Sequence, residues 1–200
     1  MAEYAKTAAV KAGIIDACLS AFGEAGFHGV SMAEVARRAG VSHTGLTHHF
    51  PRKEDLLTAV LERQDVRAAE FLRVHDAEAA GIDPLELLRG VTGSLEGREE
   101  PHGLAELTAV LTGEATTAGH PAHEHFRERY ARMRSFITRL FTRLAEQGRL
   151  RSPAPASQQA ATVIALVDGL RLQWLYAPDT VNMEASLRAQ LALMVIEAED

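Results

Sequence analysis

Six polar side chains in one short segment have the chemistry that DNA recognition requires. The segment runs SHTGLTHH from Ser42 to His49 and contains hydroxyl groups and imidazoles. At helical spacing, one face of the segment carries four of these side chains: His43, Thr44, Thr47 and His48. A helix fits the major groove of duplex DNA, where hydroxyls and imidazoles can reach base edges and phosphates. We therefore expect this segment to read double-stranded DNA.

Two helix starts and a tight turn surround these side chains. Ser31 and Glu34 have the spacing of a capping box, in which hydroxyl and carboxylate each accept a free backbone N–H. Gly40 stands where a left-handed residue would end the first helix, and Ser42 is placed to cap a second one. Pro51 cannot extend that second helix. The pattern predicts two short helices within residues 31–50.

Small and apolar residues indicate that these two helices pack steeply against each other. Ala36 is small where two helices must approach closely, and further apolar contacts are available from Val35, Ala39, Val41 and Leu46. This arrangement is typical of a helix-turn-helix. An ordinary helical hairpin without a DNA-binding role is the alternative, but it would have to reproduce the cap, the small residue and the glycine by coincidence.

The rest of the chain reads as helical, so the predicted fold class is all-α with about nine helices. A stripe of Val10, Ile14, Cys18 and Phe22 predicts a first helix over about 6–25 that Gly23 and Gly26 end. The other expected helices start at Arg52, at Asp83-Pro84, near Leu104 and at Pro121, where Gly148 closes the helix, and two final helices cover 157–177 and 182–198. No segment alternates as a strand would.

Composition and charge limit the classes of protein to which the chain can belong. The 21 basic and 27 acidic residues give a net charge of −6, and residues 1–64 hold seven of each, so the acidic excess lies in 65–200. This argues against a generic nucleic-acid coat protein, but it allows a small DNA-reading module on an acidic body. The single cysteine, Cys18, argues against a secreted disulfide scaffold. No apolar run approaches the length of a membrane span, so we expect a cytoplasmic protein.

The run from Ile14 to Leu57 resembles the DNA-binding domain of the TetR (tetracycline-repressor-like) family of bacterial regulators. The resemblance lies in I-I-x-A-x-x-x-x-F-x-x-x-G-F, in SMAEVARRAGVS and in L-T-H-H-F-P-x-K-E-D-L-L, and less specifically in DGLRLQWLYAPDTV near the end. It implies a three-helix DNA-binding domain over 1–55, with its motif at 31–50. It also implies a helical effector-binding and dimerisation domain over 56–200.

The same resemblance implies roles for particular residues. Ser42, His43, Thr44, Thr47 and His48 would lie on the recognition helix, with His49 beside a position that contacts the DNA backbone. Ser31 and Lys53 would each hold a phosphate from the start of a helix. Where this chain has Leu46-Thr-His-His-Phe50, the family commonly has L-Y-H-Y-F, and losing both tyrosines puts some phosphate and sugar contacts in doubt.

The family also implies a homodimer that binds a palindromic operator, joined through the last two helices. Both helices are apolar on more than one face, which is typical of helices buried on several sides, although the core of a monomer would share that pattern. A small-molecule effector would release the repressor from DNA. The effector and its contact residues are unknown from the sequence, as is the choice between repression and activation.

Two other functions remain as alternatives. His120, His123 and His125 could make a metal-responsive regulator or a metal enzyme, but their spacing matches no metal motif, so a solvated helix start is the simpler interpretation. An all-α protein that has lost DNA binding is the other, supported by the missing tyrosines. No phosphate loop, G-x-S-x-G or dinucleotide fingerprint occurs. We expect no enzymatic activity, no cofactor and no metal site.

Overall fold

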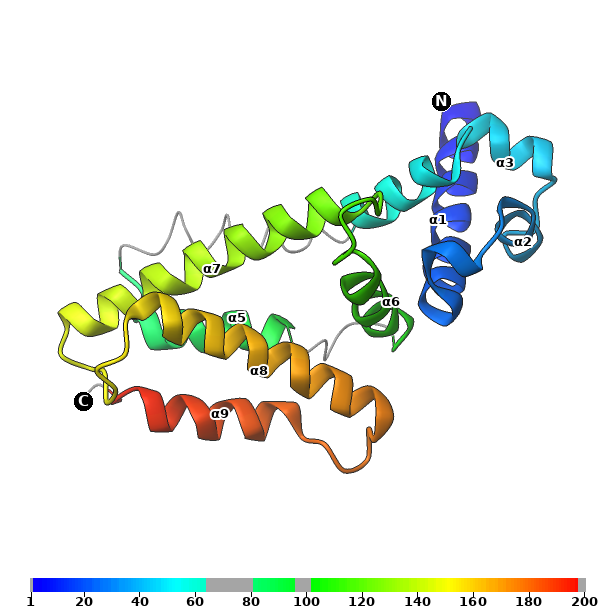
Figure 1. Cartoon of the computed structure of the whole chain (residues 1–200). Helices are drawn as coiled ribbons and strands as arrows, with labels where there is room; N and C mark the ends of the chain where they lie inside the picture. The colour runs from blue at the N-terminus through cyan, green and yellow to red at the C-terminus, as the bar shows by residue number, and fades with distance from the viewer. Residues whose placement is uncertain (1, 64–80, 96–101, 198–200) are drawn as a thin grey trace. The chain divides into compact units, whose positions relative to one another are not determined.

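The computed structural model describes residues 2–63, 81–95 and 102–197, and over these residues the chain is almost entirely helical (Figure 1). Its helices are α1 (Ala2–Gly29), α2 (Met32–Arg38), α3 (His43–His49), a helical stretch over 53–63, α5 (Pro84–Leu95), α6 (His102–Glu114), α7 (His123–Glu146), α8 (Ala156–Tyr176) and α9 (Met183–Met194). The only pairing of extended backbone in this described part is an isolated bridge between Leu150 and Val195. The all-α prediction is confirmed.

The chain divides into two compact units. The first unit contains α1, α2, α3, the 53–63 helix and α6, together with the loop that follows α6. The second unit contains α5, α7 from Arg127 onward, α8 and α9. Because α6 belongs to the first unit, this unit combines two segments that are far apart in the sequence.

The first helix continues past its predicted end. Gly23 is buried inside α1 and remains helical, because a helix that packs tightly tolerates the roughly 1 kcal/mol that an internal glycine costs. Gly26, at φ 71 and ψ 175, breaks the helix, and Phe27 to Gly29 form a further turn. Gly26 therefore interrupts α1 as predicted, whereas the expectation for Gly23 is wrong.

The core of the first unit follows the predicted stripe of α1. Ile14, Cys18 and Phe22 are fully buried, while Val10 is half-buried. Burial raises the pKa of the Cys18 thiol to about 12, because the thiolate would lose its hydration. Leu56, Leu57 and Val60 of the 53–63 helix are buried too. The predicted continuation of that helix lies outside the described residues.

The core of the second unit is an extended apolar cluster. α7 contributes its inward row, and α5, α8 and α9 pack against it; the largest members are Leu88, Phe136, Ile137, Leu140, Phe141, Leu144, Ile164 and Leu191. Two predicted helix boundaries are confirmed. At the start of α5, the Asp83 carboxylate accepts the N–H of Leu85 at 2.9 Å, and Gly148, at φ 69, follows the end of α7.

The last helix ends earlier than its apolar pattern predicts. α9 stops at Met194, and Val195 pairs with Leu150 as extended backbone. The N–H of Ile196 donates to the carbonyl of Arg149 at 2.8 Å, and the N–H of Arg151 donates to that of Met194 at 3.0 Å. This pairing with a distant segment satisfies the backbone that the helix would otherwise use.

Candidate DNA-binding site

The start of α2 has half of the predicted capping box. The Ser31 hydroxyl accepts the N–H of Glu34 at 3.2 Å. The Glu34 carboxylate instead accepts from Arg37 at 2.7 and 2.9 Å and from Arg38 at 2.7 Å. Hydrogen bonds between charged groups are stronger than those to a backbone amide, so the guanidinium groups take the carboxylate.

The same arginines connect α2 to α1. Arg38 donates two hydrogen bonds to Glu24 of α1, at 2.7 and 2.8 Å, as well as the one to Glu34. Hydrogen bonds from Arg38 lower the pKa of Glu24 to about 2, and bonds from Arg37 and Arg38 do the same for Glu34. All of these groups are at least partly exposed to solvent, so this network orients α2 more than it stabilises the fold.

The turn between α2 and α3 has the predicted geometry. Gly40 has a φ of 66, a left-handed conformation that a side chain would strain. The N–H of Val41 donates to the carbonyl of Ala36 at 3.0 Å and closes the turn. The Ser42 hydroxyl then accepts the N–H of Gly45 at 3.0 Å, which confirms Ser42 as the cap of α3.

A small apolar seam holds the two helices. Val35 and Leu46 are fully buried, and Ala36 and Phe50 are nearly so. Ala39 and Val41, which the sequence also assigns to this seam, are only half-buried. The inner side of α3 is therefore fixed by Leu46, with Phe50 directly after the helix.

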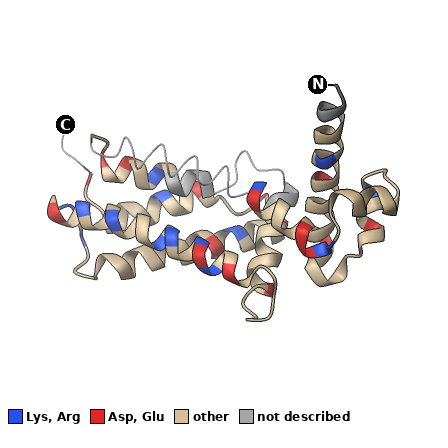
Figure 2. Ribbon diagram, turned by 90° about the horizontal axis from the view of Figure 1, so that it is seen from above, with Lys and Arg blue, Asp and Glu red and all other residues tan. Residues whose placement is uncertain are grey.

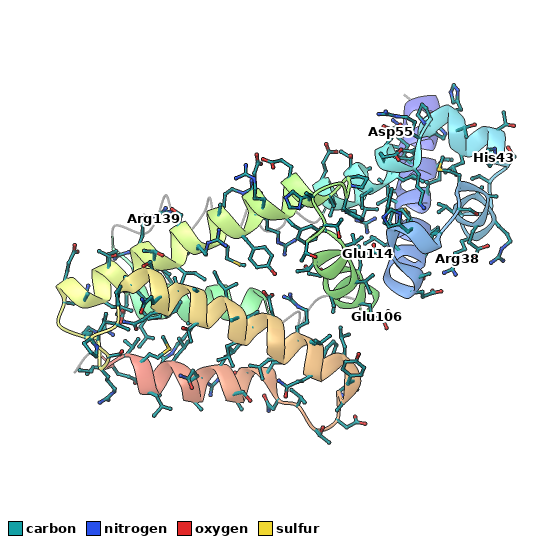
Figure 3. All side chains as sticks on the ribbon, in the orientation of Figure 1. Arg38, His43, Asp55, Glu106, Glu114 and Arg139 are labelled. Atoms are coloured by element: carbon teal, nitrogen blue, oxygen red, sulfur yellow. The ribbon has the colours of Figure 1, made fainter. Side chains whose placement is uncertain are left out.

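The opposite side of α3 presents the polar side chains. Ser42, His43, Thr44 and His48 are exposed, and Thr47 and His49 are half-exposed. His43 extends outward from the start of α3 (Figure 3), and α3 contains no Lys or Arg, so its ribbon is tan throughout (Figure 2). The Thr47 hydroxyl lies within hydrogen-bond distance of the carbonyls of His43 (3.1 Å) and Thr44 (3.2 Å).

The two residues expected to hold phosphates differ in their surroundings. Ser31 is exposed at the start of α2. Lys53 is half-buried, and its Nζ lies 4.5 Å from the centre of the Phe27 ring, in a cation–π contact. Arg52, beside it, has a side chain 73% exposed and paired with Asp55 at 3.1 Å. The sequence interpretation did not select Arg52, although the run Pro51-Arg-Lys53 is a signal for it.

The histidines after α6 do not gather as metal ligands. Among the residues that the structure describes, no three His, Cys, Asp or Glu side chains are placed to hold an ion together. His120 is buried against α1, and Nδ1 of His123 lies 2.8 Å from the carbonyl oxygen of Ala115. Within the same described ranges, no helix has both the length and the apolar character to cross a bilayer.

Comparisons with known proteins agree with this geometry. Residues 14–60 match the family of bacterial regulatory proteins of the tetR type, and residues 86–195 match the C-terminal domain of BetI-type transcriptional repressors. The HTH-type transcriptional regulator BetI of Escherichia coli O45:K1 (strain S88 / ExPEC) is 32% identical over 167 residues, covering 82% of this chain and 80% of its own. BetI of Yersinia pestis (strain Pestoides F) is 29% identical, with 87% and 85% covered.

Solved structures share the fold at lower identity. A transcriptional regulator from Saccharomonospora viridis in complex with choline has a TM-score of 0.76 at 21% identity, over 95% of this chain and 100% of its own. NalD, the secondary repressor of the MexAB-OprM multidrug efflux pump in Pseudomonas aeruginosa, has a TM-score of 0.75 at 19% identity, over 96% and 99%. The chain belongs to the TetR family of bacterial transcriptional regulators. It is a DNA-binding regulator rather than an enzyme, as the sequence predicted.

Proposed function

We propose that the chain is a repressor that binds a palindromic operator as a homodimer, with α3 in the major groove. The observation that carries this proposal is the two-sided character of α3. Leu46 is buried on one side, while Ser42, His43, Thr44 and His48 are exposed on the other. One such helix reads only a few base pairs, so specificity requires two of them related by symmetry.

Some side chains of the site are assigned to base edges and others to phosphates. His43, Thr44, Thr47 and His48 contact base edges. Ser31, Ser42 and His49 contact phosphates, because they lie at helix ends. Lys53 is assigned to a phosphate as well, reached from its place over the Phe27 ring, and the exposed Arg52 is an additional contact. Each neutralised phosphate contributes about 0.9 to the slope of log affinity against log salt concentration. Because the interface has few cations, operator affinity should fall only modestly as the salt concentration rises.

The dimer interface is assigned to α8 and α9. Large apolar side chains are exposed there in the single chain: Leu172 at 50%, Tyr176 at 85% and Leu193 at 70%. Exposed apolar side chains of this size mark surfaces that another protein covers. Leu193→Glu places a charge in this surface and should shift sedimentation from dimer to monomer at micromolar concentration. Ala131→Glu, at an exposed position of α7, is the matched control and should remain dimeric.

The effector is assigned to the C-terminal domain, within the proposed division into residues 1–55 and 56–200. The C-terminal match to BetI-type repressors supports this location. The solved relatives carry dissimilar ligands, since one is the SmeT–triclosan complex and another holds choline, so the fold alone selects no effector. Release follows if the effector favours a dimer whose recognition helices no longer match major grooves about 34 Å apart. We place the protein in the cytoplasm, where its operator is.

A binding titration on the regulator's own promoter DNA tests the proposal. Fluorescence anisotropy should show tighter binding to this DNA than to a scrambled duplex of equal length, with a modest salt slope. Thr44→Ala and His48→Ala should each weaken the promoter complex and leave binding to the scrambled duplex nearly unchanged. Glu62→Ala, at an exposed position outside the site, is the control. Equal affinity for both duplexes at every salt concentration would refute the assignment.

A further inference from the structure

A carboxylate from the end of α6 reaches the break in α1. The backbone N–H of Phe27 donates to Oε2 of Glu114 at 2.9 Å, although the two residues are 87 positions apart. The break at Gly26, which turns the backbone to φ 71, lies directly before this N–H. Both helices belong to the first compact unit, and Figure 3 shows Glu114 at the end of α6 on the side of α1. The contact therefore joins α6 to the end of α1.

The fit around this carboxylate is close. A Cβ on Gly26 would lie 2.2 Å from Oε1 and 2.9 Å from Cδ of Glu114, so any side chain there would displace the carboxylate. Gly26 is thus required twice, for its positive φ and for the approach of Glu114. A carboxylate that accepts a backbone N–H in such confined surroundings holds both partners in one geometry.

A buried histidine lies beside the same carboxylate. Nδ1 of His120 accepts the N–H of Ala122 at 3.1 Å, so the proton of the neutral ring sits on Nε2. Nε2 lies 3.6 Å from Oε2 of Glu114, just beyond hydrogen-bond distance, and the His120 side chain is 2% exposed. The ring packs edge-on against Phe27, with centroids 5.3 Å apart. Phe27, Glu114 and His120 form one cluster, which we call the Glu114 clasp.

Two contacts connect the clasp to the helices before and after α3. The ammonium of Lys53 lies over the ring of Phe27, and Lys53 begins the helical stretch that follows α3. Glu24, just before the break in α1, accepts two hydrogen bonds from Arg38 of α2. A shift of the last turn of α6 must therefore either carry Phe27 with it or break the hydrogen bond to Glu114.

We propose that Glu114 is a positioning residue for operator binding: by holding the Phe27 N–H, it sets the place of α1, and with it α2 and α3, on DNA. This inference rests on the proposed function, because it concerns how α3 is presented to an operator. Glu114 itself touches no DNA in this proposal. It acts through Phe27, and loosening the clasp lowers operator affinity without altering any side chain of α3.

Two substitutions separate the hydrogen bond from the charge. Glu114→Ala removes the acceptor, whereas Glu114→Gln keeps an acceptor oxygen and loses the charge. We expect Glu114→Ala to weaken operator binding about tenfold or more and to speed exchange of the Phe27 amide proton, and Glu114→Gln to restore most of both. Glu62→Ala removes the same charge from an exposed site of the first unit and should change neither. The measurements are anisotropy on promoter DNA and amide exchange on the full chain.

A merely structural role gives a different result. If folded Glu114→Ala exchanges the Phe27 amide faster but binds the operator as tightly as the wild type, the inference is overturned. The wild type supplies a second test that needs no variant: operator DNA should slow exchange of the Phe27 amide further, and no slowing would also overturn it. If the wild type shows no operator preference, the proposed function is refuted. If the wild type binds its operator and Glu114→Ala binds it equally well, only the role of the clasp is refuted.

Discussion

The contacts inside the helix-turn-helix join residues that are close in sequence, whereas contacts inside the second unit join distant segments. Between Ser31 and Phe50, the fixing contacts join near neighbours, such as Ser31 with Glu34 and Ser42 with Gly45. In the second unit they join distant segments: Asp83 pairs with Arg149, 66 residues away. Local contacts leave a pattern that one sequence reveals, and distant contacts do not. This is why the sequence indicates a candidate DNA-binding helix but no effector site.

The two regions also expose different chemistry. The helix-turn-helix buries a small apolar seam and exposes hydroxyls and imidazoles on α3. The second unit buries a large apolar cluster and still exposes Leu172, Tyr176 and Leu193. A polar face suits DNA, and an exposed apolar face suits another protein. Each surface therefore calls for its own kind of test.

The largest expected effect is in the core of the second unit. Phe141 of α7 is fully buried, and Phe141→Ala leaves a cavity that should lower the free energy of unfolding by about 3–5 kcal/mol. Urea denaturation followed by circular dichroism measures this loss. Thr142→Ala, at the exposed neighbouring position, should change it little. A loss below about 1 kcal/mol for Phe141→Ala would show that this cluster does not dominate stability.

The long-range ion pair should come next. Arg149 donates to both oxygens of Asp83, at 2.8 and 3.1 Å, and to the carbonyl of Ile196 at 3.0 Å. Because Arg149 is largely buried while Asp83 remains a third exposed, Arg149→Met should lower the free energy of unfolding by about 1–2 kcal/mol, less than the loss of a fully buried pair. Arg188→Met, in an exposed pair with Glu184, should change it by less than about 0.5 kcal/mol. Equal losses for the two variants would show that the burial of Arg149 adds nothing to its pair with Asp83.

The same pair gives a pH dependence with a defined sign. The Arg149 guanidinium lowers the pKa of Asp83 from its usual 3.8. Since the folded state favours the ionised carboxylate, the pair stabilises the fold above pH 3.8 and loses its effect as the pH falls through the lower folded value. The stability difference between the wild type and Arg149→Met should therefore shrink on acidification below pH 3.8. A difference that grew on acidification would exclude this carboxylate as its source.

A smaller effect is expected at the cap of α3. Ser42→Ala removes the acceptor for the Gly45 N–H and should lower the free energy of unfolding of the first unit by about 1 kcal/mol. It should also weaken operator binding, because α3 has only seven residues and begins at this cap. Ser157→Ala, at an exposed serine in the first turn of α8, is the control. Unchanged operator binding by Ser42→Ala would show that α3 is ordered without its cap.

The sequence predicts the local elements well because their causes are local. The cap at Ser42 and the turn at Gly40 depend on neighbouring residues and are confirmed. The carboxylate of Glu34 was misassigned because two arginines compete for it, and the end of α9 was misplaced because Val195 pairs with Leu150. Gly26 was correctly predicted as a break, but its contact with Glu114 could not be foreseen, since nothing near Gly26 in the sequence indicates a partner in α6.

Selection of bound duplexes from a random pool is the sharpest test of whether α3 reads base edges and does so twice per dimer. We expect a palindromic consensus with half-sites about one helical turn apart, or a multiple of that spacing. In the same selection, Thr44→Ala should relax the preference at one position in each half-site. A wild-type pool that shows no enrichment, or an enriched sequence that α3 substitutions leave unchanged, would contradict the account.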